Sequence, residues 1–213
     1  MPHRATPDGM ARVLIVDNDE ETRLSLLKLF QRSNISATSL ETGTDLFRSA
    51  DLTSPGCLLL ATDLEDMSGL DIQRRLAAEE CSLPIVFITG DATIPMAVEA
   101  MKRGAHDFLL KPLDADIVVD AVHSALQRDS AARAHLAERD LARRLIETLT
   151  RREREVMKFV AAGDLNKQIA HHLDVSEMMV KIHRSRMMKK MGANSVVQLI
   201  KKLDLVYGKS IFR

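Results

Sequence analysis

Four segments in the first half of the chain end in polar side chains of the types that functional sites use. Each follows a short apolar run, and the four ends are Asp17-Asn18, Ala61-Thr62-Asp63, Thr89-Gly90 and Lys111. Carboxylates, hydroxyls and an ammonium group gathered in one place would suit an acidic enzyme site, for example that of a phosphatase. Whether they gather depends on the fold of the apolar runs before them.

A second group of side chains is cationic and lies near the C-terminus. It consists of Lys167, Lys181, Arg184, Arg186 and Lys189. Lysine and arginine neutralise DNA phosphates, and exposed side chains near the start of a helix in the major groove reach base edges. A merely solvated basic surface is the alternative. The cluster coincides with a turn and helix caps, which favours DNA binding.

The first half alternates apolar runs with helical patterns. Strands are expected over 12–16, 35–40, 57–60, 84–89 and 107–110, with helices over 20–32, 44–50, 69–80 and 93–103. This alternation, at about 20–25 residues per unit, predicts an α/β fold with a doubly wound parallel sheet and helices on both faces. Sites in such sheets lie at the carboxyl ends of the strands, where the four polar segments stand.

Residues 150–213 are helical by pattern. Thr150 and Glu153 form a capping box, Gly163 ends that helix, and further helices are expected over 166–173, 177–191 and 195–205. Asp174-Val175-Ser176 forms a turn in which Ser176 can cap the next helix. A short helix, a tight turn and a second helix with a cationic outer face are typical of a helix-turn-helix DNA reader.

The segment between the two halves contains neither glycine nor proline from Leu113 to Ala162. We expect a fifth helix, a helical linker over 129–149 and then the first helix of the basic half. The apolar stripe of the linker is thin and comprises Ala134, Ala137, Leu141, Leu145 and Leu149. A solvated linker and a helix that pairs with its twin in a dimer therefore both stay open.

The net charge of the 213 residues is zero, but it conceals a division. Residues 1–128 carry 12 basic and 20 acidic side chains, whereas 129–213 carry 18 and 10. This asymmetry predicts two domains with different partners, the basic one for nucleic acid. No apolar run approaches the roughly 18 residues of a membrane span, the N-terminus has no apolar signal region, and two cysteines cannot form a disulfide framework. The expected location is the cytoplasm.

Specific motifs in both halves resemble a known family. The stretch LTRREREVMKFVAAGDLNKQIAHHLDVSEMMVKIHRSRMMKKMGANSVVQLI resembles the LuxR/NarL-type DNA-binding domain over nearly its whole length. Residues 10–128 resemble a response-regulator receiver, and VFITGDATIPMAVEAMKRGAHDFLLKP is similar to the FixJ subfamily. The resemblance implies a flavodoxin-like (βα)5 receiver over 10–128, a linker over 129–149 and a four-helix, all-α DNA-binding domain over 150–207.

The resemblance also implies roles for single residues in the basic half. By position, Lys181, Ile182 and Ser185 are the expected major-groove readers. Phosphate contact or flanking support is expected of Lys167, Arg184, Arg186 and Lys189. Met179 stands where the family usually has a threonine, so a hydroxyl that could touch a phosphate is absent.

The receiver departs from its family where phosphoryl chemistry should take place. Aligning CLLLATDLEDMSGL with the pattern C-L-L-L-D-x-x-M-P-G-M-S-G-L places Ala61 at the phosphoacceptor aspartate. The acidic pair after the first strand becomes Asp17-Asn18, and Met-Pro-Gly becomes Leu64-Glu65-Asp66. Magnesium prefers charged oxygen ligands, and two of three usual carboxylates are gone.

The remaining positions of this pocket match the family. Thr89, Lys111 and the aromatic switch residue Phe108 are in place. Without a carboxylate at position 61, Lys111 is expected to turn to Asp17, because an unpaired buried ammonium is costly. We expect neither a bound metal nor another cofactor here.

The altered receiver has three possible interpretations. An engineered Asp→Ala variant is disfavoured by the simultaneous changes at Asn18, Glu65 and Asp66. Asp63 as a substitute acceptor lies two residues further, in the loop. The favoured interpretation is a degenerate receiver that regulates or dimerises without phosphorylation.

The leading functional hypothesis is a DNA-binding transcription regulator that binds double-stranded promoter DNA as a homodimer. The rival is an interaction protein that dimerises through its receiver and modulates another regulator. An enzyme is disfavoured by Ala61 and Asn18. The transcription machinery is a further partner considered, a sensor histidine kinase is not favoured, and no membrane partner is expected.

Other reactive side chains have simpler interpretations. His171, His172 and His183 fit helical packing better than metal binding, because no cysteine lies near them in the sequence. The methionines between 178 and 191 fit core and surface positions. Cys57 and Cys81 are interpreted as small apolar groups rather than as a redox switch.

Overall fold

The computed structural model describes residues 11–91 and 93–208. The chain divides into two compact units, Met1–Ala132 and Arg133–Arg213. Each unit has a hydrophobic core of its own.

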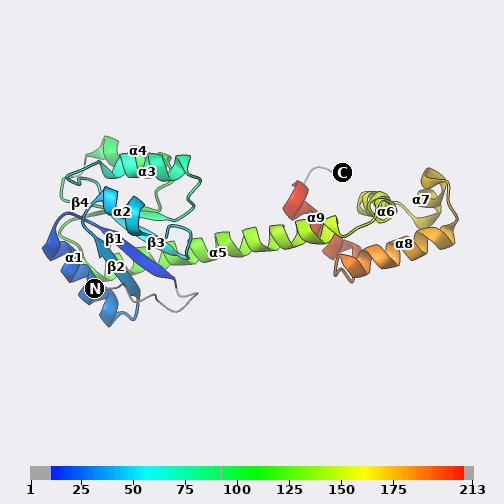
Figure 1. The fold of residues 1–213 in the computed structure, drawn as a ribbon, viewed down its shortest axis with the longest axis horizontal. Helices are drawn as coiled ribbons and strands as arrows, with labels where there is room; N and C mark the ends of the chain where they lie inside the picture. Colours follow the sequence, from blue (N-terminus) through cyan, green and yellow to red (C-terminus); the bar gives the residue numbers. More distant parts are fainter. Residues whose placement is uncertain (1–10, 92, 209–213) are drawn as a thin grey trace. The chain divides into compact units, whose positions relative to one another are not determined.

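The first unit is built on five parallel strands (Figure 1). They are β1 (Arg12–Val16), β2 (Ser36–Leu40), β3 (Gly56–Ala61), β4 (Ile85–Thr89) and β5 (Asp107–Leu110), in the spatial order β2-β1-β3-β4-β5. The pairings are in register from Arg12 with Ser36 and Gly56, and the whole of β3 is buried. The predicted doubly wound parallel sheet is confirmed.

Helices connect the strands and cover both faces of the sheet. They are α1 (Glu20–Arg32), α2 (Gly43–Ser49), α3 (Gly69–Ala78), α4 (Ile94–Lys102) and the first part of α5 (Ala115–Glu147). Parallel crossovers are right-handed, so the reversal of direction after β2 puts α1 on one face and α2, α3 and α4 on the other (Figure 1). The start of α5 lies beside α1, since side chains of both helices line one groove.

Small differences from the predicted elements have local causes. The third helix ends at Ala78 rather than at 80, because Glu80 adopts a left-handed φ of 55°. On α1, Leu24 is exposed, and the buried positions are Leu26 and Phe30.

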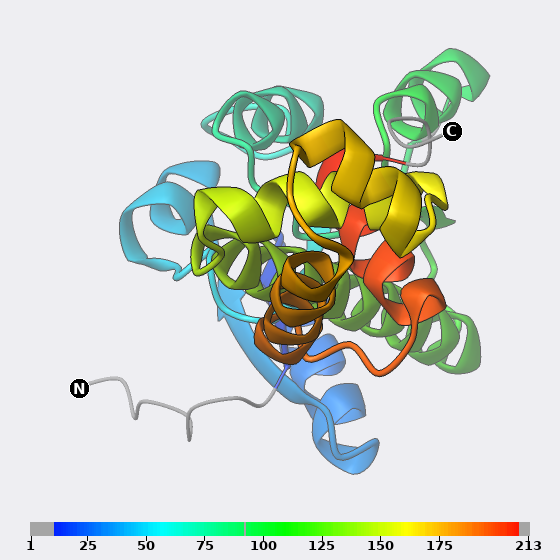
Figure 2. The same ribbon diagram turned by 90° about the vertical axis from the view of Figure 1, so that its right-hand side faces the viewer.

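The second unit contains the end of α5 and four further helices, which are visible in Figures 1 and 2. They are α6 (Arg151–Ala162), α7 (Asn166–Leu173), α8 (Glu177–Lys190) and α9 (Val196–Tyr207). Helix α8 contacts both α6 and α7, and α9 packs on α6. Buried residues on all four form the core, among them Val156, Ile169, Val180, Met187 and Leu199.

The predicted caps of the second unit are present. Thr150 and Glu153 form the capping box of α6, and Gly163 ends that helix with a φ of 94°. Ser176 caps α8, because its side chain accepts a hydrogen bond from the backbone of Met179. The cap by Ser176 fixes the end of the turn between α7 and α8.

The segment predicted as a linker is helical and partly buried. Ile146 near the end of α5 and Leu149 just after it belong to the core of the second unit, and Ala142 of α5 is also buried. Leu141, by contrast, is exposed. Among the described residues, no helix is both long and apolar enough to cross a membrane.

Candidate functional site

The carboxyl ends of four strands enclose a polar pocket in the first unit. Its volume is about 510 Å³, and it is lined by Asp17, Asn18, Ala61, Thr62, Asp63, Ser68, Ile88, Thr89, Gly90, Asp91, Met96 and Lys111. The fold thus gathers the four polar segments that the sequence singled out. Phe108 does not line this pocket, and its ring lies 6.0 Å from that of Phe87 between centroids.

An ion pair between a buried carboxylate and a half-buried lysine occupies one side of the pocket. The Nζ atom of Lys111 lies 2.7 Å from Oδ2 of Asp17, and Asp17 is fully buried. The other oxygen, Oδ1, accepts a hydrogen bond of 2.9 Å from the backbone of Asp19. A buried carboxylate requires such partners. The expected contact between Lys111 and Asp17 is therefore present.

A methyl group stands at the end of β3, where the family pattern has a carboxylate. Ala61 is buried, and α3 begins directly against it. A Cβ atom on Gly69 would lie 2.4 Å from the carbonyl oxygen of Ala61, so only glycine fits there. The end of β3 is consequently held in place, but it presents no nucleophile to the pocket.

The donor set of this pocket does not fit a magnesium ion. Magnesium requires several hard oxygen ligands in near-octahedral geometry. Asp17 is paired with Lys111, and Ala61 offers no ligand. Asp19 instead caps α1 and accepts a hydrogen bond of 2.6 Å from Thr22, which lowers the pKa of its carboxyl. No chemistry of this pocket is therefore assigned to a metal.

The loop after β3 is tied to α2 by a contact that the sequence did not indicate. Asp66 accepts hydrogen bonds from the backbone of Gly43 (3.1 Å) and from the backbone and hydroxyl of Thr44 (2.7 Å each). Desolvation works to raise the pKa of the Asp66 carboxyl, but these hydrogen bonds outweigh it and lower the pKa. A carboxylate at a helix N-terminus is also favoured by the helix dipole. Asp66 thus acts as a second cap of α2.

The exposed face of α8 carries most of the predicted DNA-binding residues. Lys181, Ser185, Arg186 and Lys189 are exposed, as is Lys167 on α7. Ile182 lies at the border of exposure, at 36%. The opposite face of α8, with Val180, Met187 and the cap residue Met191, is buried. The structure therefore gathers these cations on a surface that a ligand can reach, while their contacts with DNA stay predictions.

Arg184 is placed differently from the other cations. It is half-buried, and its Nη1 atom donates a hydrogen bond of 2.9 Å to Oδ1 of Asn166, the first residue of α7. This bond joins the two helices on either side of the turn. A contact between Arg184 and a DNA phosphate stays a prediction.

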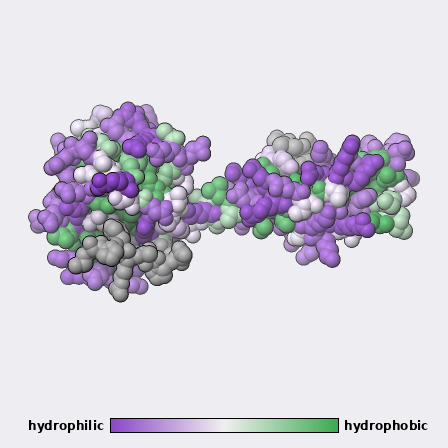
Figure 3. Space-filling model, viewed as in Figure 1, coloured by the Kyte–Doolittle hydropathy of each residue, from purple (hydrophilic) through white to green (hydrophobic). Residues whose placement is uncertain are grey.

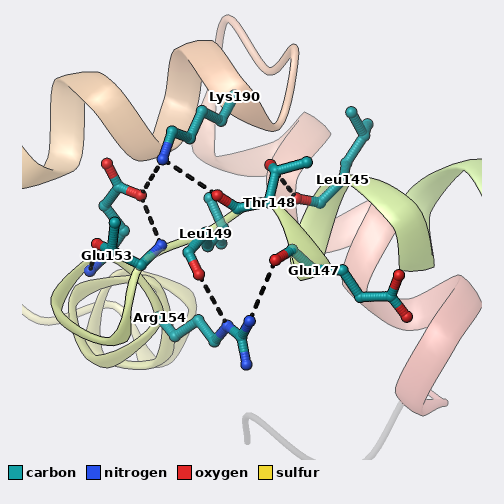
Figure 4. Close-up of polar contacts among 8 residues, drawn as sticks. Leu145, Glu147, Thr148, Leu149, Glu153, Arg154 and Lys190 are labelled. Carbon is teal, nitrogen blue, oxygen red and sulfur yellow. Dashed lines mark hydrogen bonds and ion pairs between the residues drawn. The ribbon is translucent and has the colours of Figure 1, made fainter.

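A polar cluster fixes the C-terminal end of α8 against the start of α6 (Figure 4). Oε2 of Glu153 accepts hydrogen bonds from Nζ of Lys190 (2.7 Å) and from the backbone of Thr150 (2.9 Å). Lys190 also donates to the carbonyl oxygen of Thr148 (3.1 Å). Burial works to raise the pKa of the Glu153 carboxyl, but the bonds from Lys190 and Thr150 outweigh it and lower the pKa.

Comparisons with known proteins agree with this architecture. Residues 13–123 match the family "Response regulator receiver domain", and 147–203 match "Bacterial regulatory proteins, luxR family". The chain is 43% identical to "Nodulation protein W" of Bradyrhizobium diazoefficiens, over 90% of this chain and 84% of that protein.

The chain belongs to the response regulators with a LuxR-type DNA-binding domain.

Further similar proteins match this response regulator over most of its length. "Transcriptional regulatory protein FixJ" of Rhizobium meliloti is 35% identical over 89% of this chain and 93% of its own length. The solved structure "Low Resolution Structure of Response Regulator StyR" is 33% identical, covers 92% of this chain and 99% of its own, and has a TM-score of 0.83. The family consists of DNA-binding transcription regulators and not of enzymes.

Proposed function

We propose that this response regulator binds promoter DNA and is controlled without phosphorylation of a receiver aspartate. The observation that carries the second part is the pocket itself. Ala61 ends β3 with a methyl group, and Lys111 is paired with Asp17. A phosphoryl group needs a nucleophilic carboxylate, which the alanine cannot supply.

Asp63 does not replace the missing acceptor in this proposal. It lies two residues beyond Ala61, is exposed, and forms an isolated antiparallel bridge with Ser68. The carboxylates that would hold a cation beside it are reduced to Asp17, which Lys111 already neutralises. A sensor histidine kinase is therefore not proposed as a phosphodonor.

The DNA-binding surface in this proposal consists of the exposed face of α8 together with Lys167 on α7. Lys181 and Ile182 lie in the first half of α8, where side chains of a helix in the major groove reach base edges, and Ser185 lies about one turn after Lys181. Lys189 and Arg186 lie further along and are suited to phosphates, to which they would give affinity without sequence information.

A homodimer is part of the proposal. Helix-turn-helix proteins commonly bind two half-sites as dimers, so that the protein's symmetry matches that of the DNA. On the part of α5 in the second unit, Leu136 and Leu141 are exposed apolar side chains that a second copy would cover. Action in the cytoplasm, and contact with the transcription machinery once bound to DNA, follow from this role.

Two measurements on the full-length protein test the proposal. After incubation with a small phosphodonor and magnesium, intact-mass analysis should show no stable gain of a phosphoryl group. Selection from random duplexes should yield a preferred sequence that binds better than its scrambled version, with the same affinity before and after phosphodonor treatment. A stoichiometric phosphoryl gain on Asp63 or elsewhere in the receiver, or a failure to select any sequence, would contradict the corresponding part.

A further inference from the structure

The first turns of α8 expose large apolar side chains. Met178 is 64% exposed, Met179 42% and Ile182 36%. Leu165, the N-cap residue of α7, is 69% exposed. In Figure 3, hydrophobic atoms are visible at the end of the second unit where α7 meets α8. Contiguous exposed apolar groups mark interaction sites, whereas isolated ones need no explanation.

These apolar side chains share a face with the cations. Residues four or seven apart lie on one side of a helix, so Met178, Ile182, Ser185 and Lys189 form one line along α8. Lys181 and Arg186 flank this line, and Met179 stands beside Arg186. The buried residues Val180 and Met187 lie on the opposite side. A partner of this face therefore meets apolar contact at the N-terminal end of the helix and positive charge along the rest.

The chemistry of double-stranded DNA fits this arrangement. Its phosphates are anionic, and among the four standard bases only thymine carries a methyl group at the major-groove edge. A methionine side chain is long, flexible and polarisable, so it adapts to a methyl group on the floor of a groove. The residues near the start of a recognition helix are those that reach the bases.

We infer that Met178, Met179 and Ile182 read thymine methyl groups, so that the preferred DNA of this regulator carries thymines beneath the first half of α8. The inference rests on the proposed function and deepens it by naming the base. Under this inference, Met179 contacts a base, whereas the threonine usual at this position could contact a phosphate through its hydroxyl.

Replacement of thymine by deoxyuridine tests the inference directly, because it removes the methyl group and leaves the base-pairing edge unchanged. The duplex is the one selected by the full-length protein, and thymines are replaced singly and together. Each methyl group covered by these side chains should weaken binding about fourfold at fixed salt when removed. Replacement of thymines outside the protected region is the control and should leave the dissociation constant unchanged.

Variants assign the effect to the side chains. The double variant Met178→Ser, Met179→Thr should bind the thymine duplex more weakly and should lose most of its response to deoxyuridine. The matched control is Met101→Thr on α4, because Met101 is an exposed methionine outside the second unit. It should keep the full response. Lys181→Ala should weaken binding but keep the thymine-to-uracil ratio, since the ammonium does not contact a methyl group.

The outcomes separate this inference from the proposed function. Failure to select any sequence overturns the proposed function, and the inference with it. Selective binding with no thymine in the site, or with the same affinity after deoxyuridine replacement, overturns the inference alone. So does a deoxyuridine effect of equal size in the wild type and in the double methionine variant. Thermal unfolding followed by circular dichroism confirms that each variant is folded.

Discussion

The pocket of the receiver and the surface of α8 differ in how closely their residues match the family motifs. In the pocket, Thr89 and Lys111 agree with the pattern that the sequence resembles, whereas Ala61 stands where that pattern has a carboxylate. In the second unit, the sequence agrees with the family pattern both in the helices of the fold and in the cationic face of α8. Met179, which stands where that pattern has a threonine, is an exposed residue of α8.

This contrast shows which contacts stabilise each domain. The strands of the receiver are buried apolar runs, so the sheet forms whatever side chain ends β3. In the second unit, α8 is held in place by side-chain contacts with its neighbours. Lys190 of α8 binds Glu153 of α6, and Arg184 of α8 binds Asn166 of α7. The fold of the receiver therefore depends on its buried strands and not on the side chain at position 61, whereas α8 depends on its supporting contacts.

Restoring the carboxylates should give the largest change. Ala61→Asp supplies a nucleophile, but Asn18 leaves the site one negative charge short. The double variant with Asn18→Asp rebuilds three carboxylates for a divalent cation that neutralises developing charge. We expect the double variant to take up a phosphoryl group faster than Ala61→Asp, on the order of tenfold or more, and more than additively.

Rates of phosphoryl uptake from a small phosphodonor, measured at equal magnesium, decide this point. The control is Ala61→Asn with Asn18→Asp, which matches the shape of the double variant but lacks the nucleophile. If Ala61→Asp alone reacts as fast as the double variant, Asn18 is no obstacle and the contrast between the two regions reduces to one residue.

The next effect concerns base reading by α8. Lys181→Ala should weaken binding of the preferred duplex by about 1–3 kcal/mol, if its ammonium reaches a guanine edge. Arg186→Ala and Lys189→Ala should weaken all duplexes similarly and reduce the slope against salt by about one unit each. Titrations of preferred and scrambled duplexes at several salt concentrations distinguish the two classes. Unchanged discrimination by Lys181→Ala would remove it from the base readers.

A comparable effect is expected on the stability of the second unit. Glu153→Gln removes the charge that binds Lys190 and the backbone of Thr150, which should lower the free energy of unfolding by about 1–3 kcal/mol. The chain has one tyrosine, Tyr207 on α9, and no tryptophan, so tyrosine fluorescence reports on this unit. Glu155→Gln is the control, because Glu155 pairs with Arg151 and Arg152 on its own helix. It should leave the unfolding midpoint close to that of the wild type.

The stabilisation from Glu153 should also depend on pH. Its pKa is lowered by folding from the ordinary 4.5, so the unfolded chain binds the proton more readily than the folded protein. The stability is therefore fully present above pH 4.5 and is lost as the pH falls through the lower pKa of the folded state. The advantage of the wild type over Glu153→Gln should shrink in this acidic range. A constant difference down to the lowest pH would refute the assignment.

The smallest effect is expected at the loop after β3. Asp66→Ala removes three hydrogen bonds from the start of α2 but leaves the cap by Thr42 in place. Because Asp66 is exposed, the loss should be about 0.5–1 kcal/mol, in the lower part of the range for caps. Hydrogen exchange at the amides of Gly43 and Thr44 should accelerate. Glu65→Ala, on the adjacent exposed residue, should leave both amides unchanged.

Much of the fold could be predicted because its signals are local. Apolar runs bounded by polar residues predicted β1 and β5 to the residue, and helical spacing predicted α1 and α7. The alternation of strands and helices then predicted the parallel sheet, and with it the gathering of Asp17, Thr89 and Lys111 at the strand ends.

The contacts that were not predicted join residues far apart in the sequence. Asp66 and Gly43 are 23 residues apart, and Glu153 and Lys190 are 37 apart. The spacing of Thr150 and Glu153 indicates a capping box but not the lysine that shares its carboxylate. From its residue type, Arg184 is expected to be a surface cation. Only the packing of α7 against α8 brings Asn166 within hydrogen-bond distance of it.

The ion pair between Lys111 and Asp17 bears on how a cell would use this protein. Under the proposed function, the contact forms within the domain and requires no small molecule, so no phosphodonor sets the fraction of active molecules. The cell then controls promoter occupancy through the number of protein copies. Occupancy rises gradually with the expression level of the protein. If two copies assemble on each site, that response steepens at low abundance, and the rates of synthesis and degradation set its timing.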